Sequence, residues 1–375
     1  MRIAIYLGHP AHFHLFKYAV KVWGHSHGVI VTYNSKDVLV DLVRSWDEDV
    51  TIIDLKSERR GNGALSLAGQ FVRKEFRLLS ALRKQRPDII LGTSIIVAHV
   101  GKLLGIPSVI FNEDDFDVIA ASARIGYPFA THIVAPRCCR TGRWSHKVVA
   151  YDGYHELAYL GPRHFTPNPG TVDKLGNGTD PYFIVRFASL TAHHDFGRRG
   201  IGTDLARRLV NVLAASGQVY ITSERPLEPE FEPHRLKLNP SDIHHALAFA
   251  DLYVGDSQTM AAEAAVLGTP SLRFNDFVGR LSYLDELEAR YGLTFGIRRT
   301  QPDRLLDTVK ELLSKPNLKS EWRRRQRRML KETIDVSAFM VWLIDSYPNS
   351  MRAVRADPAI LGRFSFKHHD EPILA

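Results

Sequence analysis

The chain has 375 residues, of which 45% are hydrophobic and 24% are charged. These values are ordinary for a globular protein and exclude a disordered chain, and the length suits about two domains. No stretch approaches the roughly 20 apolar residues of a membrane span, and the first apolar segment is too short for a signal peptide. We therefore expect a cytoplasmic protein, whose formal charge of +8 favours anionic partners such as phosphates, nucleic acid or a membrane surface.

Short β-branched segments alternate with longer amphipathic ones in the first half of the chain, which is the pattern of βαβ units and a parallel sheet. The predicted strands there are Arg2–Leu7, Val29–Tyr33, Thr51–Leu55, Asp88–Leu91, Ser108–Phe111, His132–Ala135 and Lys147–Ala150. Helices are predicted at Phe13–Val22 and Ser66–Lys84. The second of these ends at Arg86-Pro87, because proline cannot continue a helix.

A segment dense in proline and glycine, from Gly161 to Pro181, predicts a domain boundary. The pattern then restarts, with strands predicted at Tyr182–Phe187, Gln218–Thr222, Asp251–Gly255, Pro270–Phe274 and Leu293–Ile297. The helices between and after them are predicted at Gly202–Ala215, Pro240–Ala250, Met260–Leu267 and Pro302–Leu313. The sequence thus predicts an α/β protein with two doubly wound, Rossmann-like domains, residues 1–165 and 182–335, joined by a linker at 166–181. Residues 336–375 are predicted to form a C-terminal helix and tail.

The segment from Asp251 to Pro270 reads as a strand, a small polar turn and an alanine-rich helix. A helix that opens directly after a strand presents free N–H groups and its positive dipole end, which suits a pyrophosphate. Ser257 or Thr259 can cap this helix or bond a phosphate oxygen. Glu263 lies about one turn into the helix with no obvious core partner, so it is a candidate for binding ribose hydroxyls. The alternative is a capped core helix with a solvated glutamate.

This segment resembles the donor-binding element of enzymes with the two-domain GT-B architecture. These include the non-hydrolysing UDP-N-acetylglucosamine 2-epimerases and the N-acetylglucosaminyltransferase of peptidoglycan synthesis. The resemblance implies that Glu263 binds the ribose and that Ser257 belongs to the phosphate turn. Gln258 and Thr259 depart from the pattern, because the epimerases usually have a glycine pair there.

The chain is also similar, over nearly all of residues 1–345, to a GT-B family of surface-polysaccharide gene clusters whose reaction is not assigned. The strings that carry this similarity are Gly8–His14, Tyr151–Leu160, Val185–Phe187 with Ala192–Asp195, and Ser257–Pro270. The resemblance implies two Rossmann-like domains that face each other across a cleft. It also implies that the C-terminal helix crosses back to the first domain.

The loop after the first strand, Gly8–His14, holds three histidines just before a helix. Histidine titrates near neutrality, so it suits the removal of a proton from a sugar hydroxyl. His12 matches the histidine of the first loop in the peptidoglycan transferase, and His9 and His14 are competitors. The alternative is that all three are structural, bonded to nearby backbone and carboxylates.

Glu113 follows another first-domain strand and loosely matches a catalytic glutamate of the epimerases. The epimerases also use an aspartate after the preceding strand, where this chain has Gly92-Thr93-Ser94, and that difference argues against epimerase chemistry. The aromatic string Tyr151–Leu160 is interpreted mainly as packing, with Glu156 its best functional candidate.

Arg186 and His193 follow the first strand of the second domain, close to a predicted helix start. Their charge and position suit neutralisation of a diphosphate, and His193 matches the histidine of a Thr-x-His string in the epimerases. The alternative is a structural loop with surface histidines.

The densest basic run comprises Arg323, Arg324, Arg325, Arg327 and Arg328. It is interpreted as a solvated helix face, and the alternative is a peripheral contact with an anionic membrane. Nucleic acid is not expected, because no stacking surface or known binding module is present.

Together these features predict a glycosyltransferase that uses a nucleotide-sugar donor, a UDP-sugar, and a sugar or lipid-linked acceptor in polysaccharide or glycolipid synthesis. His12 would act as the base. No cofactor or metal is expected, since the clustered histidines lack i, i+4 spacing and no Asp-x-Asp motif lies in a suitable loop. The adjacent Cys138 and Cys139 are expected to be reduced thiols. The alternatives are a UDP-N-acetylhexosamine 2-epimerase that uses Glu113 and His193, and a non-catalytic nucleotide-sugar-binding protein.

Overall fold

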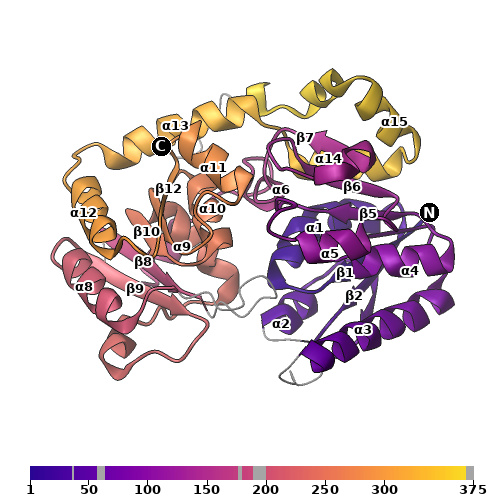
Figure 1. Cartoon of the computed structure of the whole chain (residues 1–375). Coiled ribbons are helices and arrows are strands. Elements are labelled where there is room, and N and C mark those ends of the chain that lie inside the picture. The colour runs from indigo at the N-terminus through magenta and orange to yellow at the C-terminus, as the bar shows by residue number, and fades with distance from the viewer. Residues whose placement is uncertain (36–37, 57–63, 176–179, 189–199, 369–375) are drawn as a thin grey trace. The chain divides into compact units, whose positions relative to one another are not determined.

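The computed structural model describes residues 1–35, 38–56, 64–175, 180–188 and 200–368 (Figure 1). The chain divides into two units, which we describe separately. Unit 1 comprises Met1–Tyr159 and Ile334–Ser365. Unit 2 comprises Leu160–Thr333 and the C-terminal residues from Phe366.

Unit 1 contains a seven-stranded parallel sheet in the order β3-β2-β1-β4-β5-β6-β7. The strands are β1 (Arg2–Leu7), β2 (Gly28–Tyr33), β3 (Val50–Asp54), β4 (Ile89–Gly92), β5 (Ser108–Phe111), β6 (His132–Pro136) and β7 (Val148–Tyr151). Strands β1, β4 and β5 are almost wholly buried, whereas the edge strand β3 is partly exposed. Continuous apolar strands form here because both faces of a parallel sheet are covered by helices.

The helices of unit 1 lie on both faces of this sheet. They are α1 (Pro10–Gly24), α2 (Val38–Arg44), α3 (Ala64–Gln85), α4 (Ile96–Leu104), α5 (Ala120–Gly126), α14 (Val336–Asp345) and α15 (Asn349–Ala356), with α6 (Leu157–Leu160) at the unit boundary. Right-handed crossovers place α3, α4 and α5 together on one face, where they share a core with the sheet. On the other face, Trp23 of α1 donates a hydrogen bond from Nε1 to Asp345 of α14 at 3.0 Å. The C-terminal segment therefore completes unit 1.

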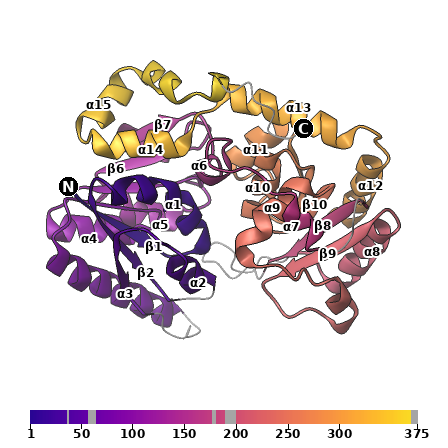
Figure 2. The same cartoon turned by 180° about the vertical axis from the view of Figure 1, so that it is seen from behind.

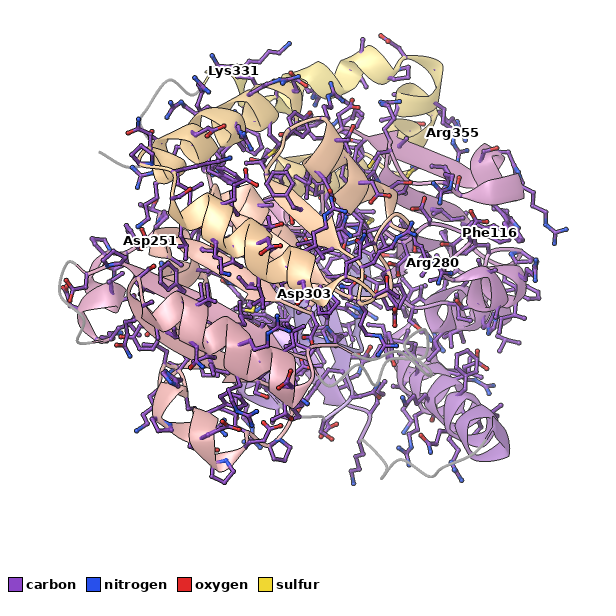
Figure 3. All side chains as sticks on the ribbon, turned by 60° about the vertical axis from the view of Figure 1, so that its left-hand side comes forward. Phe116, Asp251, Arg280, Asp303, Lys331 and Arg355 are labelled. Atoms are coloured by element: carbon purple, nitrogen blue, oxygen red, sulfur yellow. The ribbon has the colours of Figure 1, made fainter. Side chains whose placement is uncertain are left out.

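Unit 2 contains a five-stranded parallel sheet in the order β12-β11-β10-β8-β9. Figure 2 labels three of these strands, β10, β8 and β9. Its strands are β8 (Tyr182–Phe187), β9 (Gln218–Ser223), β10 (Leu252–Gly255), β11 (Ser271–Phe274) and β12 (Thr294–Ile297). Its helices are α7 (Gly170–Asp173), α8 (Thr203–Ala214), α9 (Ile243–Phe249), α10 (Gln258–Leu267), α11 (Ser282–Ala289), α12 (Pro302–Leu313) and α13 (Leu318–Glu332). Helices α8 and α12 are tied by Arg208, which donates to Asp303 at 2.6 Å; Asp303 is labelled in Figure 3.

The strand predictions agree with the structure, since all twelve strands are present with ends displaced by no more than one residue. Both sheets are parallel and reverse their strand order once, which confirms the α/β class and the two Rossmann-like halves. Among the described helices, none is long and apolar enough to cross a bilayer.

The predicted basic run lies on α13, an amphipathic helix of unit 2. Trp322 is fully buried and donates from Nε1 to the carbonyl of Leu293 at 2.9 Å. Arg325 lies over the Trp322 ring, 4.3 Å from its centroid, and forms an ion pair with Glu321. Part of the run is therefore used to anchor the helix.

Candidate functional site

Each sheet has one switch point, a pair of adjacent strands whose following connections run to opposite faces of the sheet. In unit 1 this point lies between β1 and β4, and in unit 2 it lies between β8 and β10. Ligands of open α/β sheets bind beyond the carboxyl ends of the strands at such points. The candidate sites are therefore the loops that follow these four strands.

His12 joins the two loops at the switch point of unit 1. Its Nδ1 accepts a hydrogen bond from the Gly8 amide at 3.1 Å, and the Thr93 hydroxyl oxygen lies 2.7 Å from Nε2. A neutral ring that accepts at Nδ1 carries its proton on Nε2, where it can donate to Thr93. Burial, helped by His9 and His155, lowers the pKa of His12 to about 3. His12 is therefore neutral at physiological pH and is a weak base.

His9 lies beside His12, with the two ring centroids 5.9 Å apart. It is exposed and forms the N-cap of α1, where its Nδ1 accepts from the Ala11 amide at 3.2 Å and Pro10 occupies the first helical position. The structure therefore brings the two predicted histidines together, and of the two it is His9 that faces solvent.

Glu113 follows β5 and contacts His155, which follows β7. One carboxylate oxygen accepts from the His155 amide at 2.7 Å, and the other lies 3.5 Å from His155 Nδ1. Burial and then the neighbouring Glu156 carboxylate raise the pKa of Glu113 well above its usual range. Burial lowers the pKa of His155 to about 3. Both shifts favour the neutral forms, so the proton is held on Glu113 and the pair carries no charge.

Sequence reasoning missed His155 as a member of this cluster. The string Tyr151–Leu160 does pack in the core, as Tyr151, Tyr154 and Leu157 show by their full burial. His155 and the buried Glu156 lie within this string. Two polar residues inside an apolar segment that follows a strand could have indicated a functional cluster from the sequence.

At the switch point of unit 2, Ser257 caps α10 as predicted. Its hydroxyl accepts from the Met260 amide at 3.3 Å, and Ser257 and Thr259 are both half-buried. The preceding Gly255 pairs with Arg186 of β8, and a Cβ on this glycine would lie 2.8 Å from Arg186 Cβ. Glycine therefore lets the two strand ends approach closely beside the start of the helix.

The Arg186 side chain extends from β8 toward Thr222 of β9 and Glu224, the residue directly after β9. Its guanidinium donates to Thr222 Oγ1 at 2.7 Å and forms an ion pair with Glu224. Its buried Nε has no hydrogen-bond partner among the described residues. The structure thus places Arg186 beside the turn of Ser257. His193 lies outside the described residues.

Glu263 has a core partner, contrary to the expectation from the sequence. Its carboxylate bonds His244 Nε2 of α9 at 2.9 Å, and both side chains are buried. The alanines around it bring α10 so close to its neighbours that the carboxylate meets an imidazole 19 residues away in the chain. Ribose binding by Glu263 stays a prediction, now with His244 as the residue that orients it.

Asp256, also missed from sequence, connects the end of β8 to the segment before α8. Its two carboxylate oxygens accept from the amides of Ala188 at 2.6 Å and Ile201 at 3.1 Å. Burial raises the pKa of Asp256 to about 6, although the hydrogen bonds from these two amides act to lower it. A Cβ on Gly200 would lie 1.8 Å from this carboxylate, so only glycine fits there.

Within the described ranges, no group of three or more His, Cys, Asp or Glu side chains is arranged to hold a metal ion.

No protein-family model and no curated protein matches the sequence. Solved structures are similar in fold over nearly the whole chain. A putative UDP-N-acetylglucosamine 2-epimerase from Listeria monocytogenes has a TM-score of 0.64 at 12% identity, covering 92% of this chain and 96% of that one. The glycosyltransferase of kitacinnamycin has a TM-score of 0.62 at 14% identity, covering 92% and 98%. The UDP-GlcNAc 2-epimerase from Neisseria meningitidis, bound to UDP-GlcNAc, has a TM-score of 0.58 at 11% identity, covering 94% and 100%.

Identities this low establish the fold and not the reaction. The neighbours are the glycosyltransferases and 2-epimerases that the resemblance in sequence implied. The chain therefore has the GT-B fold, built from two Rossmann-like units.

Proposed function

We propose that this chain is a glycosyltransferase that moves a sugar from a nucleotide-sugar donor, a UDP-sugar, to a sugar or lipid-linked acceptor in polysaccharide or glycolipid assembly. The observation that carries the proposal is the turn between β10 and α10. A capped helix start, an arginine on the neighbouring strand and a buried glutamate one turn into the helix come together there.

The donor diphosphate binds, in this proposal, at the N-terminus of α10, because the amides of the first helical turn and the helix dipole favour an anion. Arg186 adds a guanidinium from β8. Glu263, oriented by His244 at 2.9 Å, receives the ribose hydroxyls. These groups stabilise the charge that grows on the departing diphosphate, a task that a metal ion performs in other enzymes. We therefore propose a reaction that needs no metal.

We assign removal of the acceptor proton to His9 rather than His12. The acceptor oxygen forms a bond to the sugar's C1 as the bond from C1 to the diphosphate breaks, and the hydroxyl proton passes to the base. His12 is a poor base, since its pKa is about 3 and both ring nitrogens have partners within unit 1. His9 is exposed, and its 3.2 Å contact to the Ala11 amide is readily exchanged for water.

The second candidate is a UDP-N-acetylhexosamine 2-epimerase, and the carboxyl pair of Glu113 and Glu156 favours it. Two neighbouring acids at the carboxyl edge of a sheet, one of which raises the pKa of the other, suit the removal and return of a proton. Against this candidate, the residue after β4 that contacts His12 is Thr93, where the epimerases have an aspartate.

Calorimetric titration with UDP, GDP, CMP and dTDP tests the donor site. We expect one nucleotide to bind selectively, and Glu263→Gln to weaken it roughly tenfold, or about 1.4 kcal/mol. Glutamine keeps an oxygen that can accept from His244, so the fold should survive. The matched control is Glu311→Gln on α12, a largely exposed carboxylate that should leave binding unchanged. Failure of every nucleotide to bind, or equal affinity in Glu263→Gln, contradicts the donor site.

Turnover then separates the candidates. Incubation with UDP-N-acetylglucosamine alone should leave the sugar unchanged in a transferase, whereas an epimerase converts it to the C2 epimer without an acceptor. If the protein binds the nucleotide but does not turn over the nucleotide-sugar, either alone or with a sugar or lipid-linked acceptor, it is a non-catalytic binding protein.

A further inference from the structure

Cys138 and Cys139 are the two cysteines of the chain, and they lie side by side in the turn that follows β6. Both are free thiols and half-buried. The Cys139 side chain is hydrogen-bonded to Cys138, and this bond, followed by burial, raises the pKa of the Cys139 thiol. The two sulfur atoms are therefore close together, and Cys139 keeps its proton at neutral pH.

The turn that carries these thiols is hydrogen-bonded to the loop that follows β5. The Cys139 thiol donates to the Glu113 carbonyl at 3.0 Å. The Arg140 amide donates to the buried Asp115 carboxylate at 2.6 Å, and the Arg140 carbonyl accepts from the Phe116 amide at 2.7 Å. A chemical change at the Cys139 sulfur therefore acts directly on the backbone of this loop; Phe116 is labelled in Figure 3.

Tyr151, the last residue of β7, places a hydroxyl near the two thiols. Its side chain is fully buried, and the hydroxyl has no hydrogen-bond partner among the described residues. Burial raises the pKa of Tyr151 most, followed by the neighbouring Glu113 carboxyl and the Cys139 thiol. A buried hydroxyl without a partner is costly, and an oxygen atom added to a neighbouring sulfur would accept its hydrogen bond.

We propose that Cys138 and Cys139 are a reversible redox pair that is oxidised by hydrogen peroxide. The Cys138 sulfur attacks one peroxide oxygen, the O–O bond breaks, and the products are a sulfenic acid on Cys138 and one water molecule. The Cys139 sulfur then attacks the Cys138 sulfur, the S–O bond breaks, and the oxygen leaves as a second water with the Cys139 proton. Two thiols are thereby oxidised to one disulfide, and the peroxide is reduced to water.

Two features make this pair suited to a switch. A disulfide between adjacent residues closes a small, strained ring, so free thiols such as glutathione reduce it readily. Oxidation also removes the Cys139 S–H group, and the Glu113 carbonyl loses its donor. Because the Glu113 carboxyl accepts from the His155 amide at 2.7 Å, the change should extend to the segment after β7.

Thiol titration and intact mass of the full chain test the pair without any knowledge of the substrate. We expect hydrogen peroxide to remove both titratable thiols and two hydrogen atoms from each chain, and dithiothreitol to restore them. Cys138→Ser and Cys139→Ser each prevent the disulfide, and both keep a donor at position 139, so the fold should survive. Dimedone should label the sulfenic acid of Cys139→Ser roughly tenfold more than that of Cys138→Ser, because Cys138 meets the peroxide first.

Hydrogen–deuterium exchange locates the consequence of oxidation. The amides of Phe116, Arg140 and His155 should exchange roughly tenfold faster in the oxidised chain, and the amides of β10 in unit 2 should be unchanged. Peroxide should have no such effect on either serine variant. The proposal is overturned if both thiols survive peroxide, if the disulfide joins two chains, or if the products are only sulfinic and sulfonic acids. It is also overturned if oxidation leaves exchange at these three amides unchanged.

Discussion

Gly200 lies where the structure leaves no space for a side chain. A methyl group there would lie 1.8 Å from Asp256 Oδ2 and 2.6 Å from its Cγ, far inside van der Waals contact. The substitution Gly200→Ala must therefore displace the Asp256 carboxylate from the amides of Ala188 and Ile201. A hydrogen bond to a charged group contributes about 1.5–3 kcal/mol, so the loss of both is expected to destabilise the fold by about 3 kcal/mol or more.

Thermal and urea unfolding followed by circular dichroism measure this loss. For a unit of this size, about 3 kcal/mol corresponds to a fall in Tm of roughly 6–12 °C. The matched control is Gly202→Ala, two residues along the chain, where a Cβ meets nothing within 4 Å. Gly202 is the N-cap of α8 at φ −80°, which alanine also adopts. The poorer capping by alanine and the lower entropy of its unfolded chain offset each other, so the change in stability should be no more than about 0.5 kcal/mol.

A double-mutant cycle tests the cause. In an Asp256→Gly background the Cβ, Cγ and Oδ2 atoms that clash are all absent, so Gly200→Ala should have little further effect, and the two substitutions should couple by about 2 kcal/mol or more. Strictly additive effects, or a Gly200→Ala variant as stable as Gly202→Ala, would show that the Asp256 carboxylate does not stabilise the fold through the Ala188 and Ile201 amides.

Three further predictions follow from the sites. Replacing His9 with glutamine should lower kcat roughly a hundredfold or more at unchanged nucleotide affinity, whereas His12→Gln should mainly lower the unfolding free energy; equal kcat in wild type and His9→Gln would exclude His9 as the base. His12 and His155 have folded pKa values of about 3 against about 6.5 unfolded, so the unfolded chain binds more protons below pH 6.5 and stability falls as pH drops toward 3. Each of these histidines should lower the free energy of unfolding by about 2 kcal/mol between pH 7.5 and pH 5. The urea midpoint of the His12→Gln, His155→Gln double variant should not show this decrease with falling pH. Finally, Ser257→Ala should cost about 1 kcal/mol of stability and weaken nucleotide binding, while Asp335→Ala, which removes the cap of α14 in unit 1, should cost a similar amount and leave binding intact.

Much of the fold could be predicted from local pattern. Each strand is a short apolar segment between turn formers, so the strands were found with ends displaced by no more than one residue. Each predicted helix carries its own periodicity, and its ends were found to within three residues. The cap of α10 was also predictable, because Ser257 and the amide it accepts from are three residues apart.

The partners of the site residues could not be predicted in this way. His12 meets Thr93 across 81 residues, Glu113 meets His155 across 42, and Asp256 meets Ala188 across 68. Each pair forms because strand order places the carboxyl ends of two particular strands, or the loops after them, side by side. Glu263 looked unpartnered for the same reason, since His244 lies on another helix.

The sequence by itself thus determined the α/β class, the two Rossmann-like halves and the helix start that suits a diphosphate, because these depend on residues close together in the chain. Only the tertiary structure decided that His12 is half-buried and weakly basic, that Glu263 is oriented by an imidazole and that Gly200 must be glycine. Burial and hydrogen bonding at these positions come from residues distant in sequence, and these contacts set the pKa of each group and the space around it.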